Sequence, residues 1–206
     1  MNDSQPSSQR LSIKNHGRDA AGLTYVYPVV SRRAGGVSIG INLNVNNACN
    51  WRCIYCQVPE LQRGAPPPVD VARIRDELHE FVRYVLEGDF MQRAVPEGSR
   101  RLNDIALSGN GEPTSAKEFS AVIEVIGEVR RDMNISKDVK TVLITNGSLV
   151  HQHRVQDGLR RMRALSGEVW FKLDSATRQG RQLINDTRSG MSQVCLLYTS
   201  PSPRDS

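Results

Sequence analysis

Residues 38–56 read SIGINLNVNNACNWRCIYC, and this stretch gives the strongest indication of the fold class. Its first part, residues 38–45, alternates apolar with small or polar side chains, which is the period of a β-strand. Three cysteines follow in one loop, Cys49, Cys53 and Cys56, at spacings of four and three. Functional side chains of α/β folds gather at the carboxyl ends of strands, so this loop is the first candidate site.

Three further strand-like runs lie along the chain, and a helical pattern follows each strand. The runs span residues 104–108, 141–145 and 168–174. Strand–helix alternation at this spacing favours βαβ units and a parallel sheet. Right-handed crossovers put the helices on one side if such a sheet curls into a barrel. The expected fold class is therefore α/β, a partial (β/α) barrel that is truncated after about the fourth βα unit.

Local signals mark where two helices begin. Asp70 is expected to be the N-cap of a helix that ends near Gly88 and carries its apolar residues on one face. Ser115 and Glu118 have the spacing of a capping box, which predicts the start of a second helix.

Polar side chains alternate with apolar ones in the first and last predicted strands. Asn42 and Asn44 share one parity and are expected to face the barrel interior, because polar positions suit a lumen that holds a polar ligand. Lys172 and Asp174 share one parity in the last strand. A wet strand end explains these polar positions equally well, so both interpretations stay open.

The chain has 206 residues, of which 38% are hydrophobic and 24% charged, as is typical of a globular protein. No apolar run approaches the roughly 20 residues that span a bilayer, and the first residues are too polar for a secretory signal. We therefore expect no membrane partner and a cytoplasmic location, where thiols stay reduced. The net charge of +5 includes scattered arginine pairs, which we interpret as solvated helix faces and loop ends.

The last residues, 195–206, read CLLYTSPSPRDS and share no periodicity with the rest. They resemble one reading frame of a transposon-end adapter used in sequencing libraries, so we exclude Cys195 from any ligand set. The expected division of the chain is an N-terminal arm and lead-in over 1–37, an incomplete core over 38–194, and a non-native tail over 195–206. The native chain is expected to continue past the core.

The cysteine loop suits iron–sulfur chemistry better than zinc. A structural zinc site needs four protein ligands, and the loop supplies three. The histidines lie far from it in sequence, at His16, His79, His151 and His153. Thiolates are the usual ligands of iron–sulfur clusters, and three of them would leave one iron open to a substrate. The rival hypothesis is a non-catalytic zinc-binding module that docks on RNA through its arginines.

The spacing Cys49-x-x-x-Cys53-x-x-Cys56, with Tyr55 before the last cysteine, resembles the signature of the radical S-adenosylmethionine (radical SAM) superfamily. The resemblance implies a barrel of the radical SAM type, with a [4Fe-4S] cluster on the three cysteines as metal ligands and catalytic centre. It also implies S-adenosylmethionine at the open iron, a one-electron donor, and reductive cleavage to a 5′-deoxyadenosyl radical. That radical would abstract hydrogen from a substrate that the sequence does not identify.

The same resemblance suggests residues that would bind the cofactor. They are Tyr55, Gly109, Asn110, Gly111, Glu112, Asn146 and Asp174. The glycine turn is similar to the Gly-Gly-Glu-like turn of the superfamily, although an ordinary Asn-Gly turn has the same letters. Glu112 would either bind the ammonium group of the cofactor or stabilise the turn. Asn146 and Asp174 are candidates for its carboxylate or ribose, and Tyr55 would either flank the adenine or pack the loop.

Three strings resemble the iron–sulfur oxidoreductase group that includes wyosine synthases of tRNA. They are SGNGEPT at 108–114, LITNGSL at 143–149 and VWFKLD at 169–174. The likeness spans about residues 38–175 and suggests tRNA modification, with RNA as a partner. Some members of that group carry extra upstream cysteines, and this chain has none before Cys49, so the substrate stays open.

Overall fold

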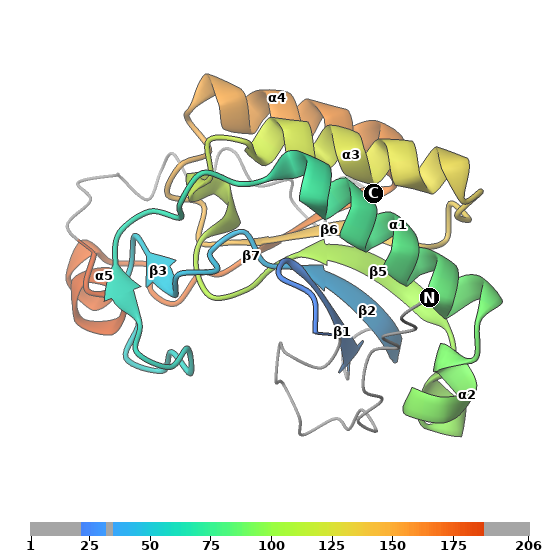
Figure 1. The fold of residues 1–206 in the computed structure, drawn as a ribbon. Helices are drawn as coiled ribbons and strands as arrows, with labels where there is room; N and C mark the ends of the chain where they lie inside the picture. The colour runs from blue at the N-terminus through green and yellow to red at the C-terminus, as the bar shows by residue number, and fades with distance from the viewer. Residues whose placement is uncertain (1–21, 32–34, 188–206) are drawn as a thin grey trace.

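The computed structural model describes residues 22–31 and 35–187. A five-stranded sheet runs through it in the order β1-β2-β5-β6-β7 (Figure 1). The strands are β1 (Val26–Ser31), β2 (Gly36–Ile41), β5 (Leu102–Leu107), β6 (Lys140–Thr145) and β7 (Gly167–Phe171). Strands β2, β5, β6 and β7 run parallel, whereas β1 pairs antiparallel with β2 at one edge. The α/β class with a parallel sheet is therefore confirmed.

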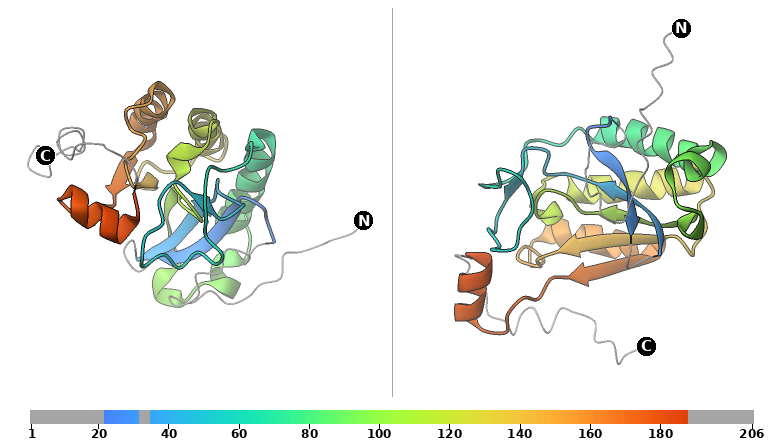
Figure 2. Two further views of the ribbon diagram at one scale, coloured as in Figure 1. Left: turned by 90° about the vertical axis from the view of Figure 1, so that its left-hand side faces the viewer. Right: turned by 90° about the horizontal axis from the view of Figure 1, so that it is seen from below.

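Three helices lie side by side over one face of this sheet (Figures 1 and 2). They are α1 (Val71–Glu87), α3 (Phe119–Asp132) and α4 (His153–Met162). The smaller elements are α2 (Phe90–Ala94), α5 (Arg178–Asn185), the 3-10 helices η1 (Glu97–Ser99), η2 (Pro113–Ser115) and η3 (Arg163–Leu165), and the strand pair β3 (Ala48–Cys49) and β4 (Gln62–Arg63). These three helices share one side of the sheet, which is the placement expected for a sheet that curls into a barrel. The sheet stays open over the described residues, so a closed barrel is not shown.

The hydrophobic core lies between these helices and the sheet. Ile39 and Ile41 of β2 point into it and are 0% exposed, as the alternation of the strand predicts. Leu78 of α1 and Phe119 of α3 meet them from the helical layer and are also 0% exposed. The alternate residues of the same strands, such as Ser38 and Gly40 of β2, point to the other face of the sheet. The candidate site lies on that face.

Strand β1 is an addition to the expected fold, because the sequence predicts only an arm and lead-in over residues 1–37. Its start is tied to α1 by Glu77, a glutamate that is 6% exposed. The Glu77 carboxylate accepts backbone N–H groups of Thr24 (3.0 Å), Tyr25 (2.8 Å) and Val26 (3.2 Å). The apolar stripe of α1 does not reveal such a polar anchor, so sequence periodicity could not find it.

The first of the two predicted helix starts is confirmed. Asp70 is the N-cap of α1, and its side chain accepts the N–H of Arg73 at 3.0 Å. Gly88 caps the other end of the helix.

The predicted capping box of Ser115 and Glu118 is wrong. Ser115 ends the 3-10 helix η2, and its hydroxyl donates to the carbonyl of Glu112 at 2.6 Å. Helix α3 begins at Phe119 with Glu118 as an N-cap that makes no side-chain bond. The turn after β5 thus continues into η2 before α3 starts, and the hydroxyl serves that turn.

None of the described helices has both the length and the apolar character needed to cross a bilayer. The adapter-like tail with Cys195 lies outside the described residues, as do His16 and most of the expected N-terminal arm.

Candidate functional site

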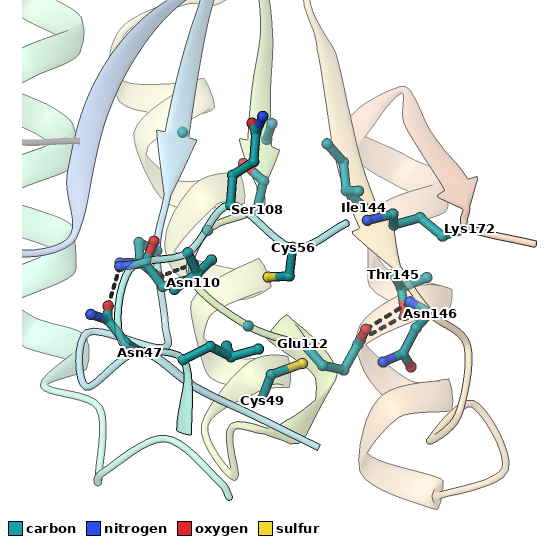
Figure 3. Close-up of a pocket in the computed structure, with 18 of the residues that line it drawn as sticks. Asn47, Cys49, Cys56, Ser108, Asn110, Glu112, Ile144, Thr145, Asn146 and Lys172 are labelled. Atoms are coloured by element: carbon teal, nitrogen blue, oxygen red, sulfur yellow. Dashed lines mark hydrogen bonds between the residues drawn. The ribbon is translucent and has the colours of Figure 1, made fainter. Parts of the chain in front are cut away.

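A cavity of about 940 Å³ lies where the parallel strands end and extends along the face of the sheet opposite the helices (Figure 3). Its lining includes every site residue suggested by the sequence. These are Cys49, Cys53, Tyr55, Cys56, Gly109, Asn110, Gly111, Glu112, Asn146 and Asp174. They come from four separate segments of the chain, and the parallel order of the strands brings these segments to one edge.

The three cysteines of the loop are all free thiols. Cys49 and Cys53 are half-buried, Cys56 is exposed, and Figure 3 shows Cys49 and Cys56 among the lining side chains. Burial raises the pKa of the Cys49 thiol, and the neighbouring charges of Glu112 and Cys53 raise it further. Over residues 22–31 and 35–187, no three His, Cys, Asp or Glu side chains are grouped so as to hold a metal ion.

The glycine turn packs tightly against the residues that follow β2. Gly109 has φ +152°, and a Cβ there would lie 2.2 Å from Oδ1 of Asn42. A Cβ on Gly111 would lie 2.2 Å from the carbonyl oxygen of Ala48, just before the first cysteine. Gly109 is therefore required by its positive φ and by the close approach of the Asn42 side chain, and Gly111 by the close approach of the Ala48 backbone. An ordinary Asn-Gly turn would not need these contacts.

Asn42 and Asn44 stabilise this arrangement. Oδ1 of Asn42 accepts the backbone N–H of Asn110 at 3.0 Å and of Asn44 at 3.1 Å. Nδ2 of Asn44 donates to the carbonyl of Ala48 at 2.8 Å. Asn42 lines the cavity as expected, but Asn44 is 1% exposed and contacts protein atoms. The expectation that Asn44 faces the interior to meet a ligand is thus corrected: its amide shapes the cysteine loop.

Glu112 is 3% exposed and connects the turns that follow β5 and β6. Its Oε1 accepts the hydroxyl of Thr145 at 2.6 Å, and its Oε2 accepts the N–H of Asn146 at 2.7 Å (Figure 3). Oε1 also accepts the hydroxyl of Thr114 at 2.6 Å. Burial raises the pKa of Glu112, although these hydrogen bonds oppose the rise. Glu112 was suggested either to bind the ammonium group of the cofactor or to stabilise the turn, and its hydrogen bonds in the structure are those that stabilise the turn.

The side chain of Asn146 reaches the cysteine loop. Its Nδ2 donates to Oδ1 of Asn50 at 3.0 Å, and Asn50 in turn donates to the hydroxyl of Ser148 at 2.7 Å. Asn50 lies directly after Cys49, so the turn after β6 orients the first cysteine. Sequence reasoning missed Asn50, because its partners follow about a hundred residues later and leave no local pattern.

Tyr55 lies at the other end of the loop and is 44% exposed. Its hydroxyl donates to Oδ2 of Asp174, and Nζ of Lys172 lies 5.0 Å from the centroid of its ring. Burial raises the pKa of Tyr55, and the hydrogen bond to Asp174 raises it further. These contacts agree with the interpretation in which Tyr55 packs the loop, here against the segment after β7.

Helix α5 also contacts this loop, which the sequence did not predict. The backbone N–H groups of Arg52 and Ile54 donate to the carbonyls of Asn185 (3.0 Å) and Ile184 (2.9 Å). Nδ2 of Asn185 donates to the sulfur of Cys53 at 3.2 Å. The loop is thus bounded by the glycine turn on one side and by α5 on the other.

No protein-family model matches the chain, and no solved structure matches it. Similarity to known proteins is partial. The chain is 28% identical over 134 residues to a UPF0026 protein of Helicobacter pylori, covering 65% of this chain and 38% of that protein. It is 30% identical over 163 residues to a UPF0026 protein of Methanocaldococcus jannaschii, covering 77% and 42%. A GTP 3′,8-cyclase of Nautilia profundicola is 29% identical over 125 residues, covering 59% and 33%.

The chain therefore spans less than half the length of these relatives. The name UPF0026 states no activity. Together, the partial matches support a relationship to radical SAM proteins at the level of the superfamily.

Proposed function

We propose that this chain carries the cluster-binding part of a radical SAM enzyme, with Cys49, Cys53 and Cys56 as the ligands of a [4Fe-4S] cluster. The observation that carries the proposal is that three free thiols of one loop line the same cavity as the glycine turn after β5. When bound, such a cluster supplies the electron that cleaves S-adenosylmethionine and so produces a radical able to abstract hydrogen.

The donor set fits this group in its chemistry. Thiolates are the usual ligands of four-iron clusters, and the loop offers three of them within eight residues, 49–56. The three sulfurs are not grouped around one point in the described part of the chain, so the proposal includes a rearrangement of this loop on loading. Cys56 is exposed and is the thiol with the most room to move.

The remaining lining residues suit the binding of S-adenosylmethionine. The absence of side chains at Gly109 and Gly111 lets the turn after β5 pack against Asn42 and Ala48, which holds the backbone of this turn at the cavity wall, where the amino acid part of a ligand would bind. Glu112 holds the backbone of Asn146 at the cavity wall, and Asp174 presents an exposed carboxylate to the ribose side. Trp51, which is 7% exposed, supplies apolar wall beside the cysteines and helps to exclude water.

The substrate that loses hydrogen is a separate proposal. The sequence strings favour an RNA, and the matches to GTP 3′,8-cyclases favour a purine nucleotide as the alternative. Both classes can be compared directly by asking which one increases the cleavage of S-adenosylmethionine by the reduced protein.

The test is anaerobic reconstitution of the chain with iron and sulfide. We expect a brown protein with about four irons per chain that forms 5′-deoxyadenosine from S-adenosylmethionine after reduction. Alanine in place of Cys49, Cys53 or Cys56 should abolish both iron uptake and product, whereas Gln57→Ala in the same loop should retain them. A folded chain that takes up no iron contradicts the proposal, and a colourless protein with stoichiometric zinc supports the RNA-docking rival.

A further inference from the structure

We propose that Asn185, at the end of α5, is a positioning residue for Cys53, and that its side-chain amide donates a hydrogen bond to the sulfur when the sulfur is a cluster ligand. The hydrogen bond to a cluster ligand rests on the proposed function. The anchoring of the loop by Asn185 does not, because the structure already contains these contacts without a cluster.

Asn185 is completely buried, with 0% of its surface exposed. Nδ2 donates to Oδ2 of Asp174 at 2.6 Å and to the sulfur of Cys53 at 3.2 Å. A carboxylate is only an acceptor, so the contact with Asp174 requires that the nitrogen of the amide, and not its oxygen, faces both partners. The side chain therefore connects the segment after β7 to a cysteine 132 residues earlier.

The other half of the same amide is left without a partner. Oδ1 of Asn185 is buried and makes no hydrogen bond among the described residues. A buried acceptor without a partner costs free energy, and an apolar side chain of the same shape would avoid that cost. An asparagine at this position is explained if the two hydrogen bonds that Nδ2 donates, to Asp174 and Cys53, outweigh the free-energy cost of the unpaired Oδ1.

The main chain at the end of α5 supports the same contact. The last carbonyls of a helix have no partner within the helix, and here two of them accept N–H groups of the cysteine loop. These are the carbonyls of Ile184 and Asn185, which accept from Ile54 and Arg52. Both donors flank Cys53, so the backbone and the side chain of α5 converge on this one thiol.

A hydrogen bond to a ligand sulfur affects the cluster that the sulfur holds. The donor stabilises the more negative, reduced state, so it raises the reduction potential. Removing the donor should lower the potential, whereas a residue that only packs α5 against the loop should leave it unchanged.

The first experiment uses the metal-free chain and measures amide hydrogen exchange at Arg52 and Ile54. Asn185→Leu keeps the branched heavy-atom skeleton of the side chain and removes both donor bonds. Only the bond to Cys53 joins α5 to the loop, so exchange at these two amides should become about tenfold faster, as expected for the loss of one hydrogen bond. The matched control is Asp186→Asn, which removes an exposed ion pair between α5 and Arg63 and should change exchange by less than twofold. If Asn185→Leu does not melt cooperatively, Asn185→Ala takes its place with the same expectation. Unchanged exchange overturns the anchoring role.

The second experiment titrates the reduction potential of the iron-loaded proteins by electron paramagnetic resonance. We expect the potential of Asn185→Leu to fall by about 59 mV, which is a tenfold change for a one-electron couple, and that of Asp186→Asn to stay at the unsubstituted value. Faster exchange with an unshifted potential overturns the bond to the ligand sulfur and leaves only a structural contact. If no protein takes up iron, including the unsubstituted chain, the proposed function fails while the exchange result still decides the anchoring role.

Discussion

The two faces of the sheet are held by different interactions. Towards the helices, Ile39, Leu78 and Phe119 pack in an apolar layer, and many van der Waals contacts together stabilise it. Towards the cavity, the loop and turns are joined by single polar bonds such as those of Glu112 and Asn185. We therefore expect the fold and the site to be disrupted by different substitutions. Core substitutions should unfold the chain, whereas site substitutions should alter the loop in a chain that stays folded.

The largest expected effect tests the apolar layer. Leu78→Ala removes a side chain with 0% exposure from the centre of α1 and should lower the free energy of unfolding by about 3 kcal/mol, because a cavity remains. Leu86→Ala on the same helix removes a side chain that is 47% exposed and should cost much less. Urea denaturation measures both, and equal losses would contradict the description of the core.

The second effect concerns the polar anchor of β1. Glu77→Ala leaves three backbone N–H groups without their acceptor and should cost about 2 kcal/mol at neutral pH. Burial alone would raise the pKa of Glu77, but the bonds from Tyr25, Arg73, Thr24 and Val26 outweigh it and lower the pKa.

Because the folded chain binds the proton of Glu77 less tightly, this stabilisation is complete above the ordinary pKa of 4.5 and is lost as the pH falls through the lowered pKa. The difference in unfolding free energy between the unsubstituted chain and Glu77→Ala should therefore shrink in acid. A difference that stays constant from neutral pH to acid would show that the ionised carboxylate does not anchor β1.

The third effect tests the carboxylate between the two turns. Glu112→Gln keeps the shape but turns an N–H group towards one of its present donors, so it should cost about 1.5 kcal/mol. Burial raises the pKa of Glu112, so the folded chain binds its proton more tightly than the unfolded chain does. Its contribution to stability should then fall as the pH rises from 4.5 through the raised pKa, and Glu112→Gln should lack this decline. Parallel pH profiles of the two proteins would contradict this assignment.

A fourth and weaker effect concerns the N-cap of α1, which lies away from the candidate site. Asp70→Ala removes the N-cap of α1 and should cost about 1 kcal/mol, with iron uptake unchanged. Thermal melting together with an iron assay checks both statements. Loss of iron uptake in this variant would show that fold and site are less separable than the two faces of the sheet suggest.

Most of the helices and strands, and the place of the site, follow from local sequence signals. The period of the strands, the stripe and cap of α1 and the position of the cysteine loop are local signals, and each was readable from neighbouring residues. The parallel order of strands then predicted that Cys49, Gly109 and Asn146 would meet at one edge, and they line one cavity.

The contacts that hold these residues in place depend on the three-dimensional fold. Glu77 anchors an unexpected strand, Asn50 joins Asn146, and Asn185 reaches Cys53, each across 50 residues or more. The capping box at Ser115 failed for a related reason, since the hydroxyl was already used by the turn before it. A hydrogen bond between distant residues leaves no periodic trace in the sequence, because one donor and one acceptor are enough to make it and almost any spacing allows it.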